Sequence, residues 1–196
     1  MIKEAIIKHL PIVTDRLIVR MPTFDDVAQI HAAKEAMWHD LQLWMSWAFD
    51  EAKSIESTRS FVETNSNKGI PLIAIRKDTK EFCVCTGIDA DDNAFETIST
   101  GYWVPLSQQG NGFATEATAA VLRFAFLLAG SKRAEICYHE GNEKSRKVIE
   151  KLGFRLEKVN VKAGKRCLDG APIDVFDYAM TDPSSIPMYN VKWGSS

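Results

Sequence analysis

The sequence predicts one domain of the mixed α/β class, in which helices flank a single twisted and mostly antiparallel sheet. A chain of 196 residues has room for one such domain, and its 45% hydrophobic and 26% charged content is typical of a globular protein. Two hairpin signals accompany a strand–helix–strand crossover, which disfavours a doubly wound parallel sheet. We expect about seven strands and about four helices in residues 1–182, and a surface tail at residues 183–196.

Seven segments have the apolar runs or the alternation that is typical of strands. They are residues 16–20, 71–77, 81–88, 97–104, 134–139, 154–168 and 173–180. The turn sequences Asp78-Thr79 and Asp169-Gly170 lie between consecutive strands, so each predicts an antiparallel hairpin. Cys83 and Cys85 are two residues apart in one strand, so we expect both to be small buried side chains on the same face.

Four segments are predicted to be helices from their apolar spacing and end signals. Two begin near residues 24 and 54, and two span residues 115–129 and 143–152. Thr23 is expected to cap the first of these helices, and Asn142 is expected to cap the last. The tryptophan-rich segment between the first two helices has no assigned element. If it is helical, Trp44 and Trp47 share one face.

Charge and hydropathy exclude several classes of protein. The net charge of -2 argues against nucleic acid as a direct partner, because phosphate-binding proteins usually have a basic excess. The most apolar stretch, residues 117–130, contains Arg123 and is too short to cross a membrane. Charged residues interrupt the N-terminal segment, so we expect no secretory signal and a reducing, cytoplasmic location. The cysteines have no metal-binding spacing, and we expect no metal.

The chemistry concentrates in a glycine-rich turn, Gln109-Gly110-Asn111-Gly112-Phe113-Ala114, between a predicted strand and a predicted helix. Small residues let the backbone approach a ligand, and a helix start offers free N–H groups, so the turn suits a pyrophosphate. It is not a Walker loop, because Phe113 and Ala114 stand where that loop needs Lys-Ser/Thr. It fits a Rossmann loop poorly, because Thr115 stands at the third glycine position and hairpin strands precede the turn.

The Gln-x-x-Gly-x-Ala pattern resembles the acyl-CoA pyrophosphate loop of the GNAT superfamily of acetyltransferases. The resemblance extends, in the family's order, over about residues 14–180. Its further motifs are Thr14-Asp15-Arg16-Leu17, Gly101-Tyr102-Trp103, Ala-Thr-Glu-Ala at 114–117, Asn142-x-x-Ser145 and Glu-Lys-Leu-Gly-Phe at 150–154. The segments LQLWMSWA at 41–48 and Val191-Lys192-Trp193 are similar to the Rim-type ribosomal-protein N-terminal acetyltransferases. The resemblance implies a sheet splayed at its middle and acetyl-CoA as co-substrate.

By this resemblance, acetyl-CoA lies across the splayed strands and against the glycine-rich turn. Backbone groups of Trp103 and Val104 would pair with the pantetheine amides, and Asn142 would bond the pantetheine arm, cap its helix, or do both. Arg146 either meets the 3′-phosphate or belongs to a solvated helix face. The implied cofactor-binding residues are Trp103, Val104, Gln109, Gly110, Asn111, Gly112, Phe113, Ala114, Thr115, Asn142, Ser145 and Arg146.

The implied reaction is direct transfer of the acetyl group to an amine. The Val104 backbone N–H is the expected oxyanion donor, and Ser145 is the expected proton donor to the departing sulfur. His139 is the candidate base, with a satisfied histidine at a strand end as the alternative. Trp44 and Trp47 would wall the acceptor side, or else pack in the core.

Three functional hypotheses follow, of which two are for an enzyme and differ in the acceptor. The first is the α-amino group of a protein N-terminus, such as that of a ribosomal protein. The second is a small amine, for which an acidic group at Asp89, Asp91, Asp92 and Glu96 could attract a cation. The third is a non-catalytic acyl-CoA sensor. A monomer and a homodimer are both compatible with the sequence.

Overall fold

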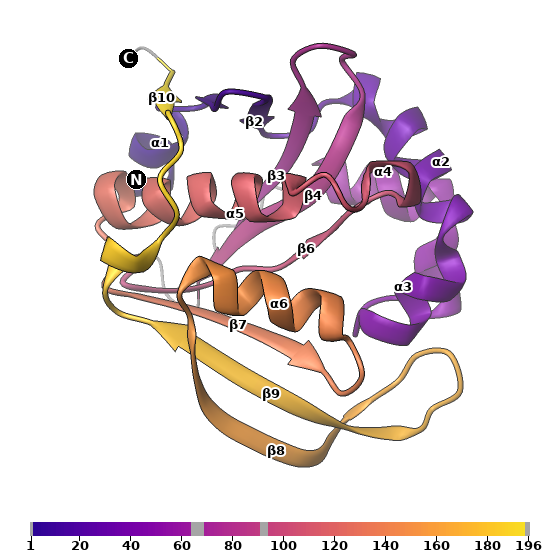
Figure 1. Ribbon diagram of the computed structural model, residues 1–196. Helices are drawn as coiled ribbons and strands as arrows, with labels where there is room; N and C mark the ends of the chain where they lie inside the picture. Colours follow the sequence, from indigo (N-terminus) through magenta and orange to yellow (C-terminus); the bar gives the residue numbers. More distant parts are fainter. Residues whose placement is uncertain (1, 64–68, 91–93, 195–196) are drawn as a thin grey trace.

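A computed structural model describes residues 2–63, 69–90 and 94–194 of the chain. Its sheet has the order β10-β1-β2-β3-β4-β5-β7-β9-β8, and β6 pairs with β4 beside this path (Figure 1). The strands are β1 (Ile12–Val13), β2 (Leu17–Arg20), β3 (Gly69–Arg76), β4 (Phe82–Ala90), β5 (Thr97–Ser99), β6 (Tyr102–Trp103), β7 (Arg133–His139), β8 (Arg155–Lys165), β9 (Pro172–Met180) and β10 (Lys192–Trp193). β5 and β7 are parallel, and the other pairs are antiparallel.

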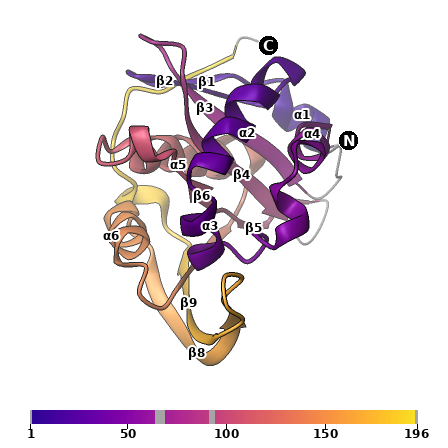
Figure 2. The ribbon, with the colours of Figure 1, turned by 90° about the vertical axis from the view of Figure 1, so that its right-hand side faces the viewer.

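Helices cover both faces of the sheet (Figure 2). They are α1 (Ile2–Ile7), α2 (Val27–Ala36), α3 (Trp38–Trp44), α4 (Ile55–Glu63), α5 (Phe113–Phe124) and α6 (Glu143–Leu152). A π-helical segment at Ala125–Ala129 extends α5. The α5 and α6 side chains pack in the larger apolar cluster, and α2, α3 and α4 pack in a second cluster on the opposite face. None of the helices in the described ranges is long and apolar enough to cross a bilayer.

The predicted fold class is confirmed, but the predicted counts are too low. The described part of the chain has ten strands and six α-helices. β1 and β10 have two residues each, which is too short for an alternating pattern to be recognised in the sequence. α3 was missed because its tryptophans mask any simple polar face.

The predicted strand at 97–104 divides into β5 and β6, and this division opens the sheet. β5 pairs with β7 from Thr97 to Ser99, and the Thr100 N–H still donates to the Glu135 carbonyl at 3.0 Å. Beyond that point the chain leaves β7, and β6 pairs with β4. The Thr86 hydroxyl donates to the Gly101 carbonyl at 2.9 Å, which holds the departing segment on β4. The sheet is therefore splayed between β6 and β7.

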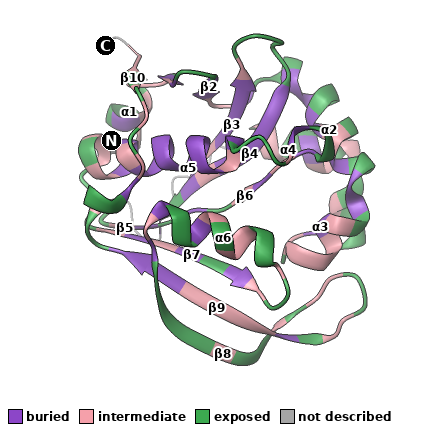
Figure 3. Cartoon of the chain, viewed as in Figure 1, coloured by how far each residue is buried: buried purple, intermediate pink, exposed green. Residues whose placement is uncertain are grey.

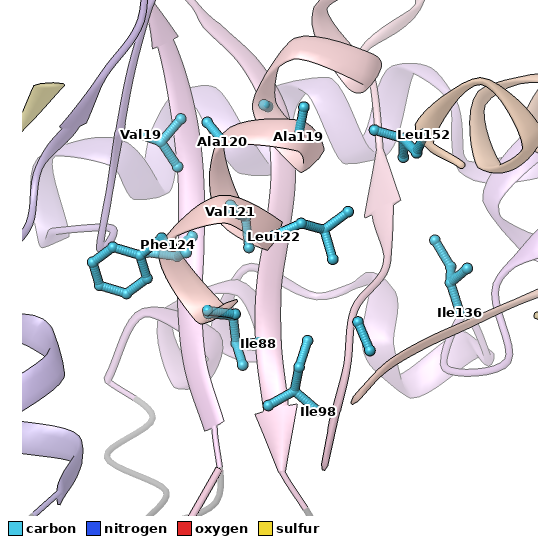
Figure 4. Close-up of a cluster of buried hydrophobic side chains, with 14 of the residues drawn as sticks. Val19, Ile88, Ile98, Ala119, Ala120, Val121, Leu122, Phe124, Ile136 and Leu152 are labelled. Carbon is cyan, nitrogen blue, oxygen red and sulfur yellow. The ribbon is translucent and has the colours of Figure 1, made fainter. Parts of the chain in front are cut away.

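The core lies between α5 and the sheet (Figure 4). Ala117, Ala119 and Ala120 are fully buried on α5, and such small side chains let the helix axis approach β4 closely. Val121, Leu122 and Phe124 fill the remaining space. β3, β4 and α5 are largely buried, whereas β8 is mostly exposed at the other edge of the sheet (Figure 3). The helix that begins at the glycine-rich turn is thus the most firmly packed helix in the molecule.

Cys83 and Cys85 are buried with free thiols, but the prediction that they share a face is wrong. A β-bulge shifts the β3–β4 register, so that Ala74 faces Val84 and Ile75 faces Phe82. The extra residue is Cys83, which packs in the α5 cluster, whereas Cys85 packs in the cluster of α2 and α3. A bulge adds one residue to one strand, so it interrupts the alternation on which the prediction depended.

The C-terminal segment contributes to the sheet edge as well as lying over the surface. β10 pairs with β1, and the Gly194 N–H donates to the His9 carbonyl at 2.9 Å. The Trp193 ring lies 5.7 Å from the Phe124 ring at the end of α5. The tail therefore covers part of the core, which a loose surface strand would not do.

A buried lysine ties α2 to the chain that leads into α4. Lys34 is 4% exposed, and its ammonium donates to the carbonyls of Ala52 and Ser54 and to the Thr58 hydroxyl at 2.8, 3.1 and 2.6 Å. Burial lowers the pKa of Lys34. Because these partners belong to the helical layer that carries Trp44 and Trp47, Lys34 stabilises that side of the molecule.

Replacing the Lys34 ammonium with an uncharged side chain should destabilise the folded protein. We expect Lys34→Met to lower the free energy of unfolding by about 1–3 kcal/mol, because buried carbonyls and a hydroxyl lose their donor. Urea denaturation measures the change. Lys53→Met, at an exposed position nearby, is the control and should change stability by less than about 0.5 kcal/mol. Equal changes in the free energy of unfolding for the two substitutions would show that the buried hydrogen bonds of Lys34 do not stabilise the protein.

Candidate active site

The glycine-rich turn becomes the N-terminus of α5. Gly110 and Gly112 have φ angles of 80° and 77°, which favour glycine, and Gly112 is the residue before the helix. A Cβ at Gly110 would meet no atom within 4 Å, so the outer face of the turn is open. The first turn of a helix has N–H groups without a carbonyl partner in the helix. The turn therefore presents backbone donors and a positive helix end to solvent, which suits a phosphate.

A buried carboxylate fixes this turn to the rest of the protein. Glu116 is 1% exposed, and the Thr14 hydroxyl donates to it at 2.6 Å. The Arg16 Nε donates to the same carboxylate at 2.7 Å, while the Arg16 Nη1 donates to the Asn111 carbonyl at 2.9 Å. The Arg16 guanidinium also lies 4.7 Å from the centre of the Phe113 ring. Arg16 thus joins the buried carboxylate to the backbone of the turn.

The side chains around the turn are also engaged. The Gln109 amide donates to the Val104 carbonyl at 3.2 Å, and the Lys144 ammonium donates to the Gln109 side-chain oxygen at 3.2 Å. Arg146 instead pairs with Glu143 at 2.8 Å on its own helix. Lys144, which the sequence analysis missed, is therefore a further cation beside the turn, in addition to Arg16, and Arg146 has carboxylate partners. The position of Lys144 on the first turn of α6 was the available signal.

A first cavity, of about 180 Å³, lies where β6 and β7 separate. We call it the splay cavity. It is lined by Trp44, Met45, Ser46, Thr100, Gly101, Tyr102, Ile136, Cys137, Tyr138, His139, Asn142 and Ser145. Four of the predicted site residues, Trp44, His139, Asn142 and Ser145, line it, from α3, β7 and the start of α6. The facing edges of β6 and β7 are not paired with each other in the described chain, so a ligand with amide groups could pair with their backbone here.

Two hydroxyls meet in the splay cavity. The Tyr102 and Ser145 hydroxyl oxygens are 3.1 Å apart, and the Tyr102 hydroxyl also lies 3.2 Å from the Ser145 carbonyl oxygen. Burial raises the pKa of Tyr102 to about 12, so its hydroxyl keeps its proton at neutral pH. The Asn142 side chain accepts from the Ser145 N–H at 3.2 Å, which confirms its role as the helix cap. The sequence analysis predicted no role for the Tyr102 hydroxyl and included Tyr102 only in the Gly101-Tyr102-Trp103 motif.

His139 lies at the end of β7 and lines the same cavity. Its Nδ1 is buried and has no hydrogen-bond partner among the described residues. Burial lowers the pKa of His139, so the neutral imidazole predominates at pH 7. A neutral imidazole with an unoccupied nitrogen can accept a proton.

A second cavity, of about 320 Å³, adjoins the first, and we call it the side cavity. It is lined by Met45, Trp47, Phe61, Gly69, Ile70, Pro71, Cys85, Thr86, Gly87, Asp89, Gly101, Tyr102 and Trp103. The two cavities share Met45, Gly101 and Tyr102. The side cavity is mostly apolar and aromatic, and it lies on the face that α3 and α4 cover. A ligand in one cavity can therefore touch a ligand in the other at Gly101 and Tyr102.

The helical condition under which Trp44 and Trp47 would share a face is not met. α3 ends at Trp44 and Met45 is extended, so Trp47 lies outside the helix. Trp44 lines the splay cavity, whereas Trp47 lines the side cavity and packs 6.5 Å from the Trp38 ring. The helix stops because the chain turns toward the buried Ala48.

The two predicted pantetheine-binding residues also differ in position. Trp103 lines the side cavity and packs edge-on against Phe82 at 5.3 Å. Val104 lines neither cavity, and its carbonyl is held by Gln109. The backbone that borders both cavities belongs to Gly101 and Tyr102.

Comparisons with known proteins agree with this geometry. Residues 16–155 match the family model described as Acetyltransferase (GNAT) domain. The chain is 27% identical over 175 residues to the uncharacterized N-acetyltransferase YoaA of Bacillus subtilis (strain 168), covering 87% of this chain and 96% of YoaA.

Solved structures have the same fold. RimL, a ribosomal L7/L12 α-N-protein acetyltransferase in complex with coenzyme A, superimposes with a TM-score of 0.78 at 22% identity, covering 88% of this chain and 97% of RimL. Mycobacterium smegmatis RimJ in complex with CoA-disulfide superimposes with a TM-score of 0.76 at 25% identity, covering 92% of this chain and 90% of RimJ. The likeness extends over nearly the whole domain.

The role of Arg16 in joining Glu116 to the glycine-rich turn can be tested by a substitution that keeps the positive charge. We expect Arg16→Lys to weaken CoA binding about 5- to 10-fold, because an ammonium cannot bond Glu116 and Asn111 together as the planar guanidinium does. Isothermal titration calorimetry measures the dissociation constant. Arg59→Lys, on the exposed side of α4, should leave it unchanged. A dissociation constant in Arg16→Lys equal to that of the wild type would refute the role of Arg16.

Proposed function

The chain belongs to the GNAT family of N-acetyltransferases, and from this membership we propose that it acetylates the α-amino group of a protein N-terminus, using acetyl-CoA. The observation that carries the proposal is the junction of two cavities at Gly101 and Tyr102. One cavity lies at the splay between β6 and β7, and the other offers about 320 Å³ of mostly apolar space for the end of a chain. The likeness to RimL and RimJ supports a protein acceptor.

We propose that the cofactor lies along the open edge of the sheet. The backbone N–H groups of residues 110–115 hold the pyrophosphate, with Lys144 beside them. The pantetheine arm enters the splay cavity, where Asn142 and the backbone of Gly101 and Tyr102 meet it. The thioester then reaches the junction at Gly101 and Tyr102. Four free cysteine thiols are compatible with a reducing, cytoplasmic setting.

The proposed reaction is direct transfer. The neutral amine nitrogen attacks the thioester carbonyl carbon, and the carbon–sulfur bond breaks as the amide bond forms. Backbone N–H groups of residues 101–104, with Val104 as the predicted donor, stabilise the oxyanion. Neutralising an α-amine at pH 7 costs only about 1 kcal/mol, whereas a lysine costs nearly 5, so a weak base suffices for an N-terminus. His139 is the proposed acceptor of the amine proton.

The departing thiolate needs a proton, and Ser145 is the proposed donor. Its hydroxyl is 3.1 Å from that of Tyr102, which keeps its own proton because burial raises its pKa to about 12. Because the Tyr102 hydroxyl donates to the Ser145 carbonyl, its oxygen can accept from the Ser145 hydroxyl and orient it, and solvent returns the proton that Ser145 gives to sulfur. The Tyr102 hydroxyl also lies 3.2 Å from the Ser145 carbonyl, so its position does not depend on the Ser145 side chain alone.

A small amine is the second candidate acceptor. Fewer of the acidic side chains that favoured it are available to attract a cation. Glu96 pairs with Lys132 at 2.9 Å, so its charge is already compensated. Asp91 and Asp92 lie outside the described residues. Asp89 remains in the side cavity and is considered below.

Acceptor specificity is tested by CoA release from acetyl-CoA with two pools, one of short peptides with free N-termini and one of polyamines and aminoglycosides. We expect turnover with peptides, because the side cavity suits an apolar chain end. Peptides acetylated beforehand at the N-terminus are the control and should be inert. Turnover confined to small amines would overturn the peptide assignment, and silence with both pools despite acetyl-CoA binding would favour the sensor hypothesis.

The proton donor is tested by Ser145→Ala. We expect kcat to fall about 10²-fold, with a smaller change in KM for acetyl-CoA, because proton transfer matters in the transition state. Steady-state kinetics with thermal unfolding measure activity and folding together. Ser57→Ala on α4 should retain wild-type kcat. A Ser145→Ala enzyme with an unchanged kcat would eliminate Ser145 as the donor.

A further inference from the structure

The side cavity contains one carboxylate in an otherwise uncharged wall. Among the described residues that line it, Asp89 is the only charged side chain. No hydrogen bond or ion pair engages the Asp89 carboxylate within the described part of the chain. Burial raises the pKa of Asp89. Asp89 is exposed to solvent as well as lining the cavity, so a positively charged ligand can reach its carboxylate, which has no cation partner among the described residues.

The register of β4 sets the distance between this carboxylate and the reaction centre. Thr86 faces Tyr102 and Asp89 faces Ser99, so Asp89 lies three residues along β4 from the strand position opposite Tyr102. At about 3.3 Å per residue this offset is about 7–10 Å from Gly101 and Tyr102, where the two cavities meet. Asp89 is therefore too far from the junction to deprotonate the reacting amine, but it lies within reach of the rest of the acceptor.

The wall between the two points is apolar. Met45, Ile70 and Pro71 line it, and Trp47 closes one side. Gly69 makes room for the carboxylate, because a Cβ at this position would lie 2.6 Å from the Asp89 Oδ1. The side cavity thus combines an apolar surface with a single anionic end.

We propose that Asp89 determines acceptor specificity by binding a second positive charge about 7–10 Å from the reacting amine. The preferred acceptors are then N-termini that have arginine or lysine as the second residue. This inference rests on the proposed peptide acceptor, although the same chemistry would also recognise a diamine. The Asp89 carboxylate acts only in binding.

The test compares two peptides that differ only in the charge at the second residue, one with arginine and one with its neutral isostere citrulline. We expect the wild type to show a kcat/KM ratio of about 10 in favour of arginine, which corresponds to about 1.4 kcal/mol. In Asp89→Asn the ratio should fall to about 1. In Gly69→Ala, which displaces the carboxylate, it should be intermediate. Glu96→Gln removes a nearby carboxylate that does not line the cavity, and should keep the wild-type ratio.

The outcomes separate this inference from the proposed peptide acceptor. A wild-type ratio near 1, or an unchanged ratio in Asp89→Asn, overturns the inference even if peptides are good substrates. If peptides are inert but 1,4-diaminobutane exceeds butylamine about tenfold only when Asp89 is intact, the peptide assignment fails and the inference stands. If no amine is acetylated, calorimetry measures the binding of 1,4-diaminobutane to the CoA complexes of the wild type and of Asp89→Asn. Equal binding by wild type and Asp89→Asn overturns the inference, and loss of binding in Asp89→Asn supports it.

Discussion

The ion pair between Arg16 and the buried Glu116 is the interaction on which the cofactor side of the protein depends. A carboxylate that is 1% exposed is stable only with several donors, and Thr14 and Arg16 supply them. This requirement holds α5 against the segment before β2. Because Arg16 also bonds the Asn111 carbonyl, the same interaction sets the position of the glycine-rich turn. One buried charge therefore connects core packing with ligand binding.

The second constraint is the separation of β6 from β7. β5 is held to β7 and β6 is held to β4, so the chain between them must leave one neighbour for the other. Unpaired backbone groups remain at the gap, and the hydroxyls of Tyr102 and Ser145 meet beside it. The splay cavity and the side cavity are consequences of this change of partner. The acceptor side is completed by α2, α3 and α4, which pack on the other face of the sheet.

Much of this arrangement was predictable, and the failures have identifiable causes. The glycine-rich turn, the Asn142 cap and the α5 and α6 helices depend on contacts within a few residues, so local patterns sufficed. The shared face of Cys83 with Cys85 was predicted wrongly, because a bulge interrupted the expected alternation. The helical condition for Trp44 and Trp47 was not met, because α3 ends at Trp44. β1 and β10 were not predicted, because a strand of two residues is defined only by the strand with which it pairs.

The sequence by itself determined the fold class, the phosphate-binding turn and the family resemblance, because each is encoded in the order and spacing of residues along the chain. Only the tertiary structure decided which side chains meet. Arg16 and Glu116 are 100 residues apart, and Tyr102 and Ser145 are 43 apart. The placement of the exposed Asp89 beside mostly apolar residues of the side cavity likewise follows from packing between strands and helices. Contacts of this kind depend on how elements pack in space, and no local pattern in the sequence specifies them.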